Sequence, residues 1–517
     1  MQKRWRLVLA AALALTVVLV LTSSTRLHPA LASTAHRLRP TSWLRPRNAL
    51  PKNALPKNAS PIAHHPLNTC AAYTDLDALT HESERHYRAR GGLSRRDFAA
   101  TLRDCTLRHY ECFRMQIVAG KVYVVEPMAP AWESRALASL LTIQAAVDRS
   151  AARWRSQVRA LGLSPGRHRN NSTQWPAWLP RRPVPDIDVM VHVGDYHHTD
   201  FHYWAYVKPH DTRNGWAFPE FGLFGWPESG LRSFPESRTA LIRDARAVPW
   251  HDKASPLVWR GRAIVPVRAS LLKAAPSFHP PDQFDIREAQ PRGDAFLNMA
   301  DQCRAYKYHL YTEGWAHSGR LKYQLLCNAV VVAHQVHFRE HFYPALVNGT
   351  HWIEMPDRHW DRLPSMMRAL RDADEADLLQ REPVDNATTT VMLAPRAMAE
   401  AAAAFAERAF SPDAISCHIQ NLAWAYHRVS TWDPFRDPVG GLSSSSSSPS
   451  SSGRSEENES PVPLSSRSET ASGPAPHPNA VALGVLIRRA MREWIDASGG
   501  AMHVHRGFHS RVHHPPS

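Results

Sequence analysis

The spacing of hydrophobic and polar residues is clearest in the segment 306–333. Residues 306–311 are rich in aromatic side chains and predict a strand. Residues 312–319 contain two glycines and several small polar residues, which is typical of a loop. The leucines that follow recur at helical spacing, and residues 330–332 form a β-branched run suited to a buried strand. The segment therefore predicts strand, loop, helix and strand in that order.

The same reading predicts a mixture of helices and strands along the rest of the globular part, and hence an α/β fold. Helical spacing covers most of these segments, whereas one alternating run predicts a strand and one pair of short runs predicts a hairpin. The predicted elements are helices over 93–107, 135–161, 397–410, 413–427 and 481–497, a helical turn over 338–343, a strand over 187–193, and a hairpin over 115–125.

The N-terminal part reads as a membrane anchor followed by a spacer. Residues 7–25 form 19 positions without a charge after a basic flank, which is close to the ~20 residues that cross a bilayer. The basic flank predicts a cytoplasmic end and a lumenal remainder, a type II topology. A cleaved signal peptide ending near Ala32 is the alternative. Residues 26–68 repeat the pattern Asn-Ala-Leu-Pro-Lys and predict an extended stem.

The composition is strongly basic, and its cysteines and glycosylation sequons suit a lumenal protein. The formal net charge of +15 and the pI of about 9.8 favour anionic ligands or surfaces, although a solvated basic surface is the default explanation. Six cysteines without a CxxC pair argue against zinc ribbons, and Cys105 and Cys112 are close enough in sequence to form a local disulfide. N-glycosylation sequons occur at Asn58, Asn170, Asn171, Asn348, Asn386 and Asn458.

The loop before residue 321 is a candidate phosphate site. Ser318 is placed as the N-cap of the following helix, whose free N–H groups and partial positive charge attract phosphate. Arg320 in the first turn is unfavourable beside the helix dipole, and a bound diphosphate removes that conflict. The alternative is an ordinary capped helix with a surface arginine.

Three further groups are candidates for chemistry. Asp195 lies just past the predicted strand 187–193, where open α/β sheets keep working groups and where ordinary turns also keep aspartate. Arg260 is either an anion ligand or a structural ion pair, and Glu340 either accepts hydrogen bonds from ribose hydroxyls or is a surface acid. The pair Asp186 and Asp188 has DxD spacing, but its position at and within the strand argues against a metal role. The histidines near residue 197 match no zinc signature and predict a solvated loop.

The motifs together resemble glycosyltransferase family 90, which includes fungal capsule-associated xylosyltransferases and animal protein O-glucosyltransferases. The resemblance covers roughly residues 70 to 432. It rests on five motifs in the expected order: Pro185-Asp-Ile-Asp with Gly194-Asp195, Phe221-Gly-Leu-Phe-Gly-Trp-Pro227, Trp250 and Lys253 with Val258-Trp-Arg-Gly261, Glu313-Gly-Trp-Ala-His-Ser-Gly-Arg-Leu-Lys-Tyr323, and Glu340-His-Phe-Tyr-Pro-Ala-Leu346.

This resemblance implies a GT-B architecture, in which two Rossmann-like domains face a cleft. It implies an inverting enzyme that uses a UDP-sugar and neither a metal nor another cofactor. Asp195 matches the catalytic base, whereas the positions implied for donor binding are Trp259, Arg260, Ala316, Ser318, Gly319, Arg320 and Glu340. Cys303 with Cys327 and Cys105 with Cys112 resemble family disulfides. Two departures are the Tyr-His-His that follows Asp195 and a serine-rich insertion before the C-terminal segment.

Together, these predictions divide the chain into six segments. Its boundaries are 1–25 for the cytoplasmic tail and anchor, 26–68 for the stem, 69–245 for the acceptor domain, 246–432 for the UDP-sugar domain, 433–478 for a serine-rich linker, and 479–517 for a C-terminal helix and basic tail.

The expected function is transfer of a sugar, xylose favoured and glucose next, to a glycan or glycoprotein acceptor in the Golgi or endoplasmic reticulum. The alternative is a catalytically inactive, membrane-anchored glycan-binding protein of the same fold. Nucleic-acid binding is not expected because no module pattern accompanies the charge, and the P-loop pattern GxxxxGK[ST] is absent.

Overall fold

The computed structural model describes a mixed α/β protein. The described residues are 68–107, 111–125, 133–163, 175–176, 178–195, 200–226, 231–289, 293–379, 393–439, 475–477 and 480–483. The predicted anchor, nearly all of the predicted stem and most of the predicted serine-rich linker lie outside them. Among the described residues, no helix combines the length and apolar character needed to cross a membrane.

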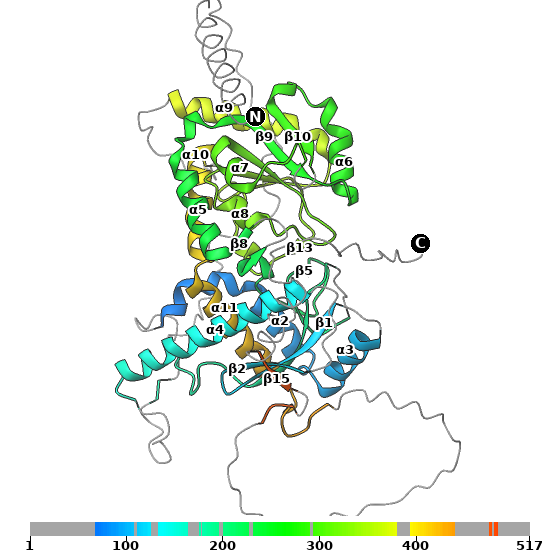
Figure 1. Cartoon of the computed structure of the whole chain (residues 1–517), viewed down its shortest axis with the longest axis vertical. Helices are drawn as coiled ribbons and strands as arrows, with labels where there is room; N and C mark the ends of the chain where they lie inside the picture. The colour runs from blue at the N-terminus through cyan, green and yellow to red at the C-terminus, as the bar shows by residue number, and fades with distance from the viewer. Residues whose placement is uncertain are drawn as a thin grey trace, which may run out of the picture. The chain divides into compact units, whose positions relative to one another are not determined.

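A six-stranded mixed sheet forms in the part of the chain that contains Asp195 (Figure 1). Its hairpin turns through Ala119 and Gly120, which have φ values of 50° and 75°, so the glycine at the second position avoids backbone strain. β3 pairs antiparallel with β1 and parallel with β4. The strands in sheet order are β15 (Ala480–Ala482), β2 (Lys121–Val125), β1 (Cys112–Val118), β3 (Ile187–His192), β4 (Trp204–Ala205) and β6 (Trp216–Ala217).

A second sheet of five strands is parallel at every pairing. The strand that comes first in the sequence, β9, has the next strand, β10, on one side and β11 on the other. The strand order therefore reverses between β9 and β11. In open parallel sheets, such a reversal leaves a crevice at the carboxyl ends of the two strands, where ligands bind. In sheet order the strands are β10 (Phe284–Glu288), β9 (Ala254–Gly261), β11 (Tyr306–Tyr311), β12 (Val330–Ala333) and β14 (Ile353–Glu354).

Helices cover both sheets, and the last of them returns to the first sheet. In Figure 1, α6, α7 and α9 lie beside the five-stranded sheet, whereas α2, α4 and α11 lie beside the six-stranded one. The helices are α2 (Ala78–Ala89), α3 (Arg95–Leu107), α4 (Glu133–Ala160), α5 (Phe234–Ala247), α6 (Pro266–Ala274), α7 (Met299–Ala305), α8 (Leu321–Leu325), α9 (Leu363–Leu379), α10 (Pro395–Ala409) and α11 (Pro412–Val429), with a 3₁₀ segment η3 (Thr69–Asp77) before α2.

The two sheets share buried contacts. One hydrophobic cluster runs from Phe113 and Val189 of the first sheet to Val331 and Ala333 of the second. A two-stranded pairing also joins β13 (Phe338–Arg339) to β5 (Lys208–Pro209). Smaller pieces complete the fold: β7 (Gly225–Trp226) pairs with β8 (Leu231–Ser233), and a 3₁₀ turn η4 (Phe221–Leu223) follows Glu220.

Three disulfides tie the described part together. Cys105–Cys112 and Cys303–Cys327 are the two pairs that the sequence and the resemblance indicated. The third, Cys70–Cys417, spans 347 residues and fixes the start of the described chain to α11. No local spacing indicates such a pairing, because it depends on α11 packing against η3.

Most predicted elements are present, with two corrections. The segment beginning at residue 481 starts as strand β15, because Ala480–Ala482 pairs with the exposed edge of β2; the predicted helix there is wrong for these residues. The helical turn predicted over 338–343 is wrong at its start, since Phe338–Arg339 is β13. A 3₁₀ turn follows at Tyr343–Ala345.

Candidate functional site

The loop between β11 and α8 lies at the carboxyl end of β11, beside the strand reversal. Its backbone is fixed by hydrogen bonds from Gly314 N to the His317 carbonyl (3.1 Å) and from Ser318 N to the Tyr311 hydroxyl (3.0 Å). A Cβ at Gly314 would lie 2.8 Å from the His317 carbonyl oxygen, so this position requires glycine. The predicted loop is therefore a rigid structure that places Arg320 at the strand reversal.

Ser318 is not the N-cap of α8, contrary to the prediction. The helix begins at Leu321, the N-cap position is Arg320, and no side chain caps it. The helix has five residues, too few aligned peptides for a strong dipole at its N-terminus. Any positive potential in this loop must come mainly from side chains.

Two arginines supply that potential. Arg320 donates to the Arg260 carbonyl, and Arg268 of α6 donates to Thr312 Oγ1 (3.2 Å) and to the Glu313 carbonyl (2.9 Å). Within the described residues, neither guanidinium forms an ion pair with a carboxylate. Burial, aided by the nearby charge of Arg268, lowers the pKa of Arg320 to about 10. Two neighbouring cations, neither of them in an ion pair with a described carboxylate, form a site that favours an anion.

Arg268 was missed by the sequence analysis. It follows Pro266 in a helix that carries no family motif, so only its place after β9, at the reversal of strand order, would have indicated it. Burial lowers the pKa of Arg268, and the charges of Tyr311 and Asp195 oppose that effect. Asp195 is therefore close enough to Arg268 for their charges to interact.

Arg260 and Trp259 have structural partners at the end of β9. Arg260 forms an ion pair with Asp285 (2.6 Å) and donates to the Asp285 carbonyl, which leaves its buried Nε without a partner among the described residues. Trp259 is 1% exposed and donates its indole N–H to Thr312 Oγ1 (3.0 Å). These contacts shape the loop, and direct contact of either residue with a donor stays a prediction.

Asp195 lies three residues beyond the end of β3, and its side chain is 37% exposed. Arg135 of α4 binds it through Nη1 at 2.9 Å. Burial alone would lower the pKa of Arg135, but the charge and hydrogen bond of Asp195 outweigh it, so the pKa is raised. The Arg135 guanidinium also lies over the Phe221 ring, 5.0 Å from its centroid. Asp195 is therefore an oriented carboxylate that remains accessible to a ligand.

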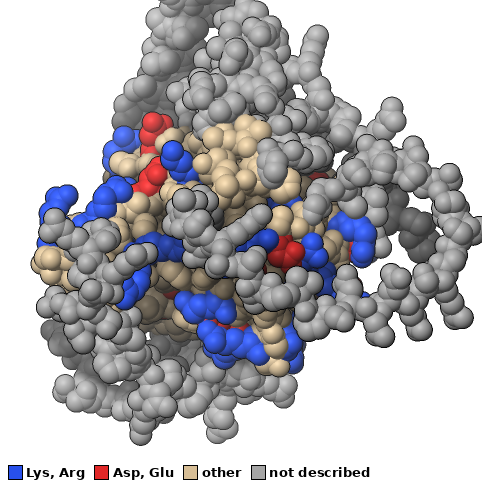
Figure 2. Space-filling view, turned by 90° about the horizontal axis from the view of Figure 1, so that it is seen from below, with Lys and Arg blue, Asp and Glu red and all other residues tan. Residues whose placement is uncertain are grey.

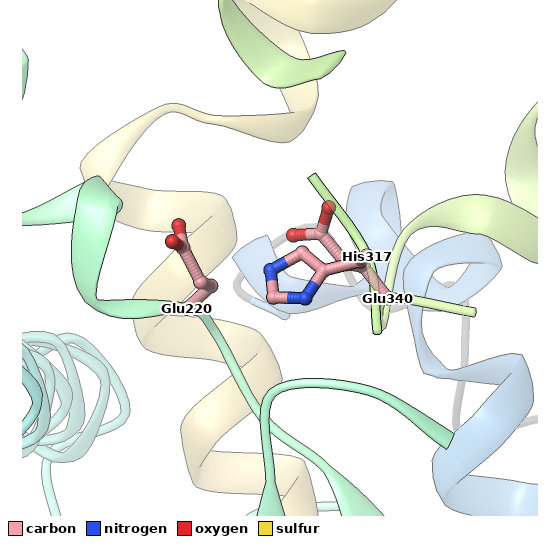
Figure 3. Close-up of side chains that lie close together, drawn as sticks. All are labelled: Glu220, His317 and Glu340. Atoms are coloured by element: carbon pink, nitrogen blue, oxygen red, sulfur yellow. The ribbon is translucent and has the colours of Figure 1, made fainter. Parts of the chain in front are cut away.

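Glu340 belongs to a buried cluster, so the alternative of a surface acid is wrong. It is 1% exposed, and its Oε2 atom has no hydrogen-bond partner among the described residues. Figure 3 shows Glu340 and His317 gathered beside Glu220, and ligand atoms of the three lie within 4.8 Å of one another. Burial raises the pKa of Glu340, while Lys322 opposes that shift.

Lys322 provides the cation of this cluster. Its ammonium forms an ion pair with Glu220 and donates to the Gly319 carbonyl (2.7 Å). A Cβ at Gly319 would lie 2.8 Å from Glu220 Oε1, which explains the glycine. Because an ammonium is already bound to Glu220, a divalent ion at the same position would face strong repulsion. The cluster fits a role in fixing the loop better than metal binding.

The remaining predicted loop residue, Ala316, is 2% exposed. Its small side chain packs into the core cluster shared by the two sheets. Ala316 and Gly319 therefore contribute mainly by allowing close packing, whereas Arg320 contributes charge.

The comparisons with known proteins agree with this geometry. The family model for glycosyl transferase family 90 matches residues 178–480, more than half of the chain. The chain belongs to glycosyl transferase family 90. The match includes Asp195, Arg268, Arg320 and the buried cluster around Lys322.

A curated member of the protein O-glucosyltransferase group gives a more distant comparison. Protein O-glucosyltransferase 1 from Bos taurus is 24% identical over 275 residues, which cover 49% of this family 90 chain. The chain spans 65% of the length of that relative. The identity is low, so the family assignment rests on the family model.

Proposed function

We propose that this protein is an inverting, metal-independent glycosyltransferase that moves a sugar from a UDP-sugar to a hydroxyl of a glycan or glycoprotein. The observation that carries the proposal is the pair Arg268 and Arg320, whose charges have no carboxylate partner among the described residues. Arg268 lies close enough to Asp195, an accessible carboxylate, for their charges to interact. A cationic pair beside a base is the arrangement that transfer from a sugar diphosphate needs.

The donor is proposed to bind at the reversal of strand order in the five-stranded sheet. There the β11–α8 loop and the start of α6 bring Arg320 and Arg268 together. Parallel topology and family membership support a GT-B arrangement with this sheet as the nucleotide domain. The other sheet is mixed rather than parallel, and it contributes Asp195 from the acceptor side.

The reaction follows from these positions. The acceptor oxygen attacks the anomeric carbon while its proton passes to Asp195. The bond between that carbon and the β-phosphate oxygen breaks, and its electron pair leaves with UDP. Arg320 and Arg268 stabilise the negative charge that develops on the phosphate, a role that other enzymes give to a metal ion. Attack from the side opposite the leaving group inverts the configuration.

Xylose remains the favoured sugar and glucose the next, a preference that comes from resemblance to the fungal members of the family. The relative named protein O-glucosyltransferase 1 supports glucose. A Golgi or endoplasmic-reticulum location with an anchor over residues 1–25 is likewise part of the proposal. Three disulfides support an oxidising compartment.

The test is release of UDP by the full chain in the presence of a chelator. UDP-xylose, UDP-glucose, UDP-galactose and UDP-N-acetylglucosamine are supplied one at a time, with and without glycan acceptors. We expect release from one donor that survives the chelator and is lost in Asp195→Asn. UDP binding without turnover on any donor and acceptor would favour the inactive glycan-binding alternative, and no UDP binding would contradict the donor site itself.

A further inference from the structure

A cavity of about 830 Å³ opens at the amino end of β3, the end opposite Asp195. Strands rise by ~3.3 Å per residue, so its floor at Asp186 and Ile187 lies on the order of 20 Å from Asp195. Its other wall comes from the end of α11 and the segment 430–436. The cavity is therefore separate from the proposed donor site.

The floor of this cavity is held by internal ion pairs. Asp186 accepts from the Ala119 backbone N–H at 2.8 Å and pairs with Arg182, and Arg114 donates to both carboxylate oxygens of Asp188, from Nε to Oδ1 and from Nη2 to Oδ2. These two residues form the DxD spacing of the sequence, and both have protein partners. The floor is therefore pre-organised and does not have to rearrange to receive a ligand.

The wall adds aromatic faces and hydrogen-bonding groups. Trp432 and Phe435 are half-buried, and among the described residues the indole N–H of Trp432 has no hydrogen-bond partner. Arg182 and His427 also line the cavity, and the pair Asp433–Arg436 adds both a donor and an acceptor. Aromatic rings with a few placed polar groups are the usual lining of a small-molecule site.

The net charge of the cavity lining indicates which class of ligand fits it. Arg182 pairs with Asp186 and Arg436 pairs with Asp433, so the lining is close to neutral and an anion would meet carboxylates as readily as cations. Ring hydroxyls can donate to Asp433 and accept from Arg182, while the apolar face of a sugar ring packs on Trp432. We propose that this cavity binds a neutral saccharide unit, at a site distinct from the catalytic one.

The wider surface differs in charge from the lining of the cavity. Figure 2 shows Lys and Arg side chains spread over the visible described surface, with few Asp or Glu side chains among them. The visible described surface is therefore mainly basic, and the near-neutral balance belongs to the cavity lining alone. That the saccharide is a branch of the acceptor glycan rests on the proposed function, whereas the binding itself does not.

The test measures saccharide binding to the full chain without UDP-sugar. Mannotriose, maltotriose and xylotriose are titrated separately by isothermal calorimetry, with saturation-transfer NMR to show which sugar protons contact the protein. We expect at least one to bind, and Trp432→Ala to weaken it by about tenfold, the loss of one aromatic contact. Phe435→Ala is the second variant, because Trp432 also packs on Phe98 and its replacement removes that contact as well.

Asp195→Asn is the control that separates this site from catalysis. It should abolish turnover and leave saccharide affinity unchanged. The proposal is overturned if none of the three saccharides binds, if both folded cavity variants bind as tightly as the wild type, or if Asp195→Asn removes the binding. Failure of UDP release with saccharide binding intact would count against the proposed function alone.

Discussion

Replacing Arg320 with methionine tests whether its charge serves a ligand or the fold. Arg320 is near a second cation, Arg268, and its one hydrogen bond goes to a backbone carbonyl. Methionine keeps the unbranched apolar part of the side chain and removes the charge. In the free protein, this change relieves repulsion with Arg268, so the free energy of unfolding should stay the same or rise.

The effect on UDP binding should be the opposite. A hydrogen bond to a charged group contributes about 1.5–3 kcal/mol. Loss of one such contact with the diphosphate therefore raises the Kd for UDP by roughly 10- to 150-fold. At a UDP concentration of about 100 times the wild-type Kd, the ligand stabilises the wild type by ~2.7 kcal/mol, and roughly half to nine-tenths of this gain should disappear in the variant.

Calorimetric titration with UDP and thermal unfolding with and without UDP measure both quantities. Arg262→Met is the matched control, because Arg262 is exposed, lies between β9 and α6, and has no ion pair with a described carboxylate. Equal UDP affinity in Arg320→Met and the wild type would refute the anion-site reasoning. A clear loss of stability in the free variant would instead show that the charge supports the fold.

Three other predictions follow from the same structure. Asp195→Asn should lower the rate of transfer by at least ~100-fold with little change in UDP affinity, because general-base catalysis contributes ~10²–10⁴-fold; a rate near that of the wild type would exclude Asp195 as the base. Burial raises the pKa of Glu340 above the ordinary carboxyl value of 4.5, so the folded state retains that proton and stability falls as pH rises from about 4.5 toward the folded pKa. Glu340→Gln should therefore show a smaller decrease in Tm between pH 5 and pH 8, and an unchanged decrease would contradict the buried environment. Breaking Cys70–Cys417 by Cys70→Ser should lower stability by about 5 kcal/mol from chain entropy, and a Tm within the error of the wild type would show that η3 and α11 stay together without it.

The sequence by itself determined the local elements and the family. The aromatic run, the glycine-containing loop and the β-branched run became β11, the β11–α8 loop and β12. The hairpin over 115–125 was likewise predicted from short-range spacing. These features depend on neighbours within a few residues, so periodicity and turn chemistry encode them. The ordered motifs indicated family 90 for the same reason, because each is a contiguous string.

Only the tertiary structure decided which charged side chains are free of ion pairs with described residues and can therefore bind a ligand. Arg260 and Arg320 looked equivalent in the sequence, yet Asp285 on the adjacent strand pairs with Arg260 and no described carboxylate pairs with Arg320. Arg268 joined the site because the order of parallel strands brings the start of α6 to the carboxyl end of β11. The Cys70–Cys417 disulfide also joins residues far apart in the chain. Such pairings depend on the packing of whole elements, which short-range spacing does not encode.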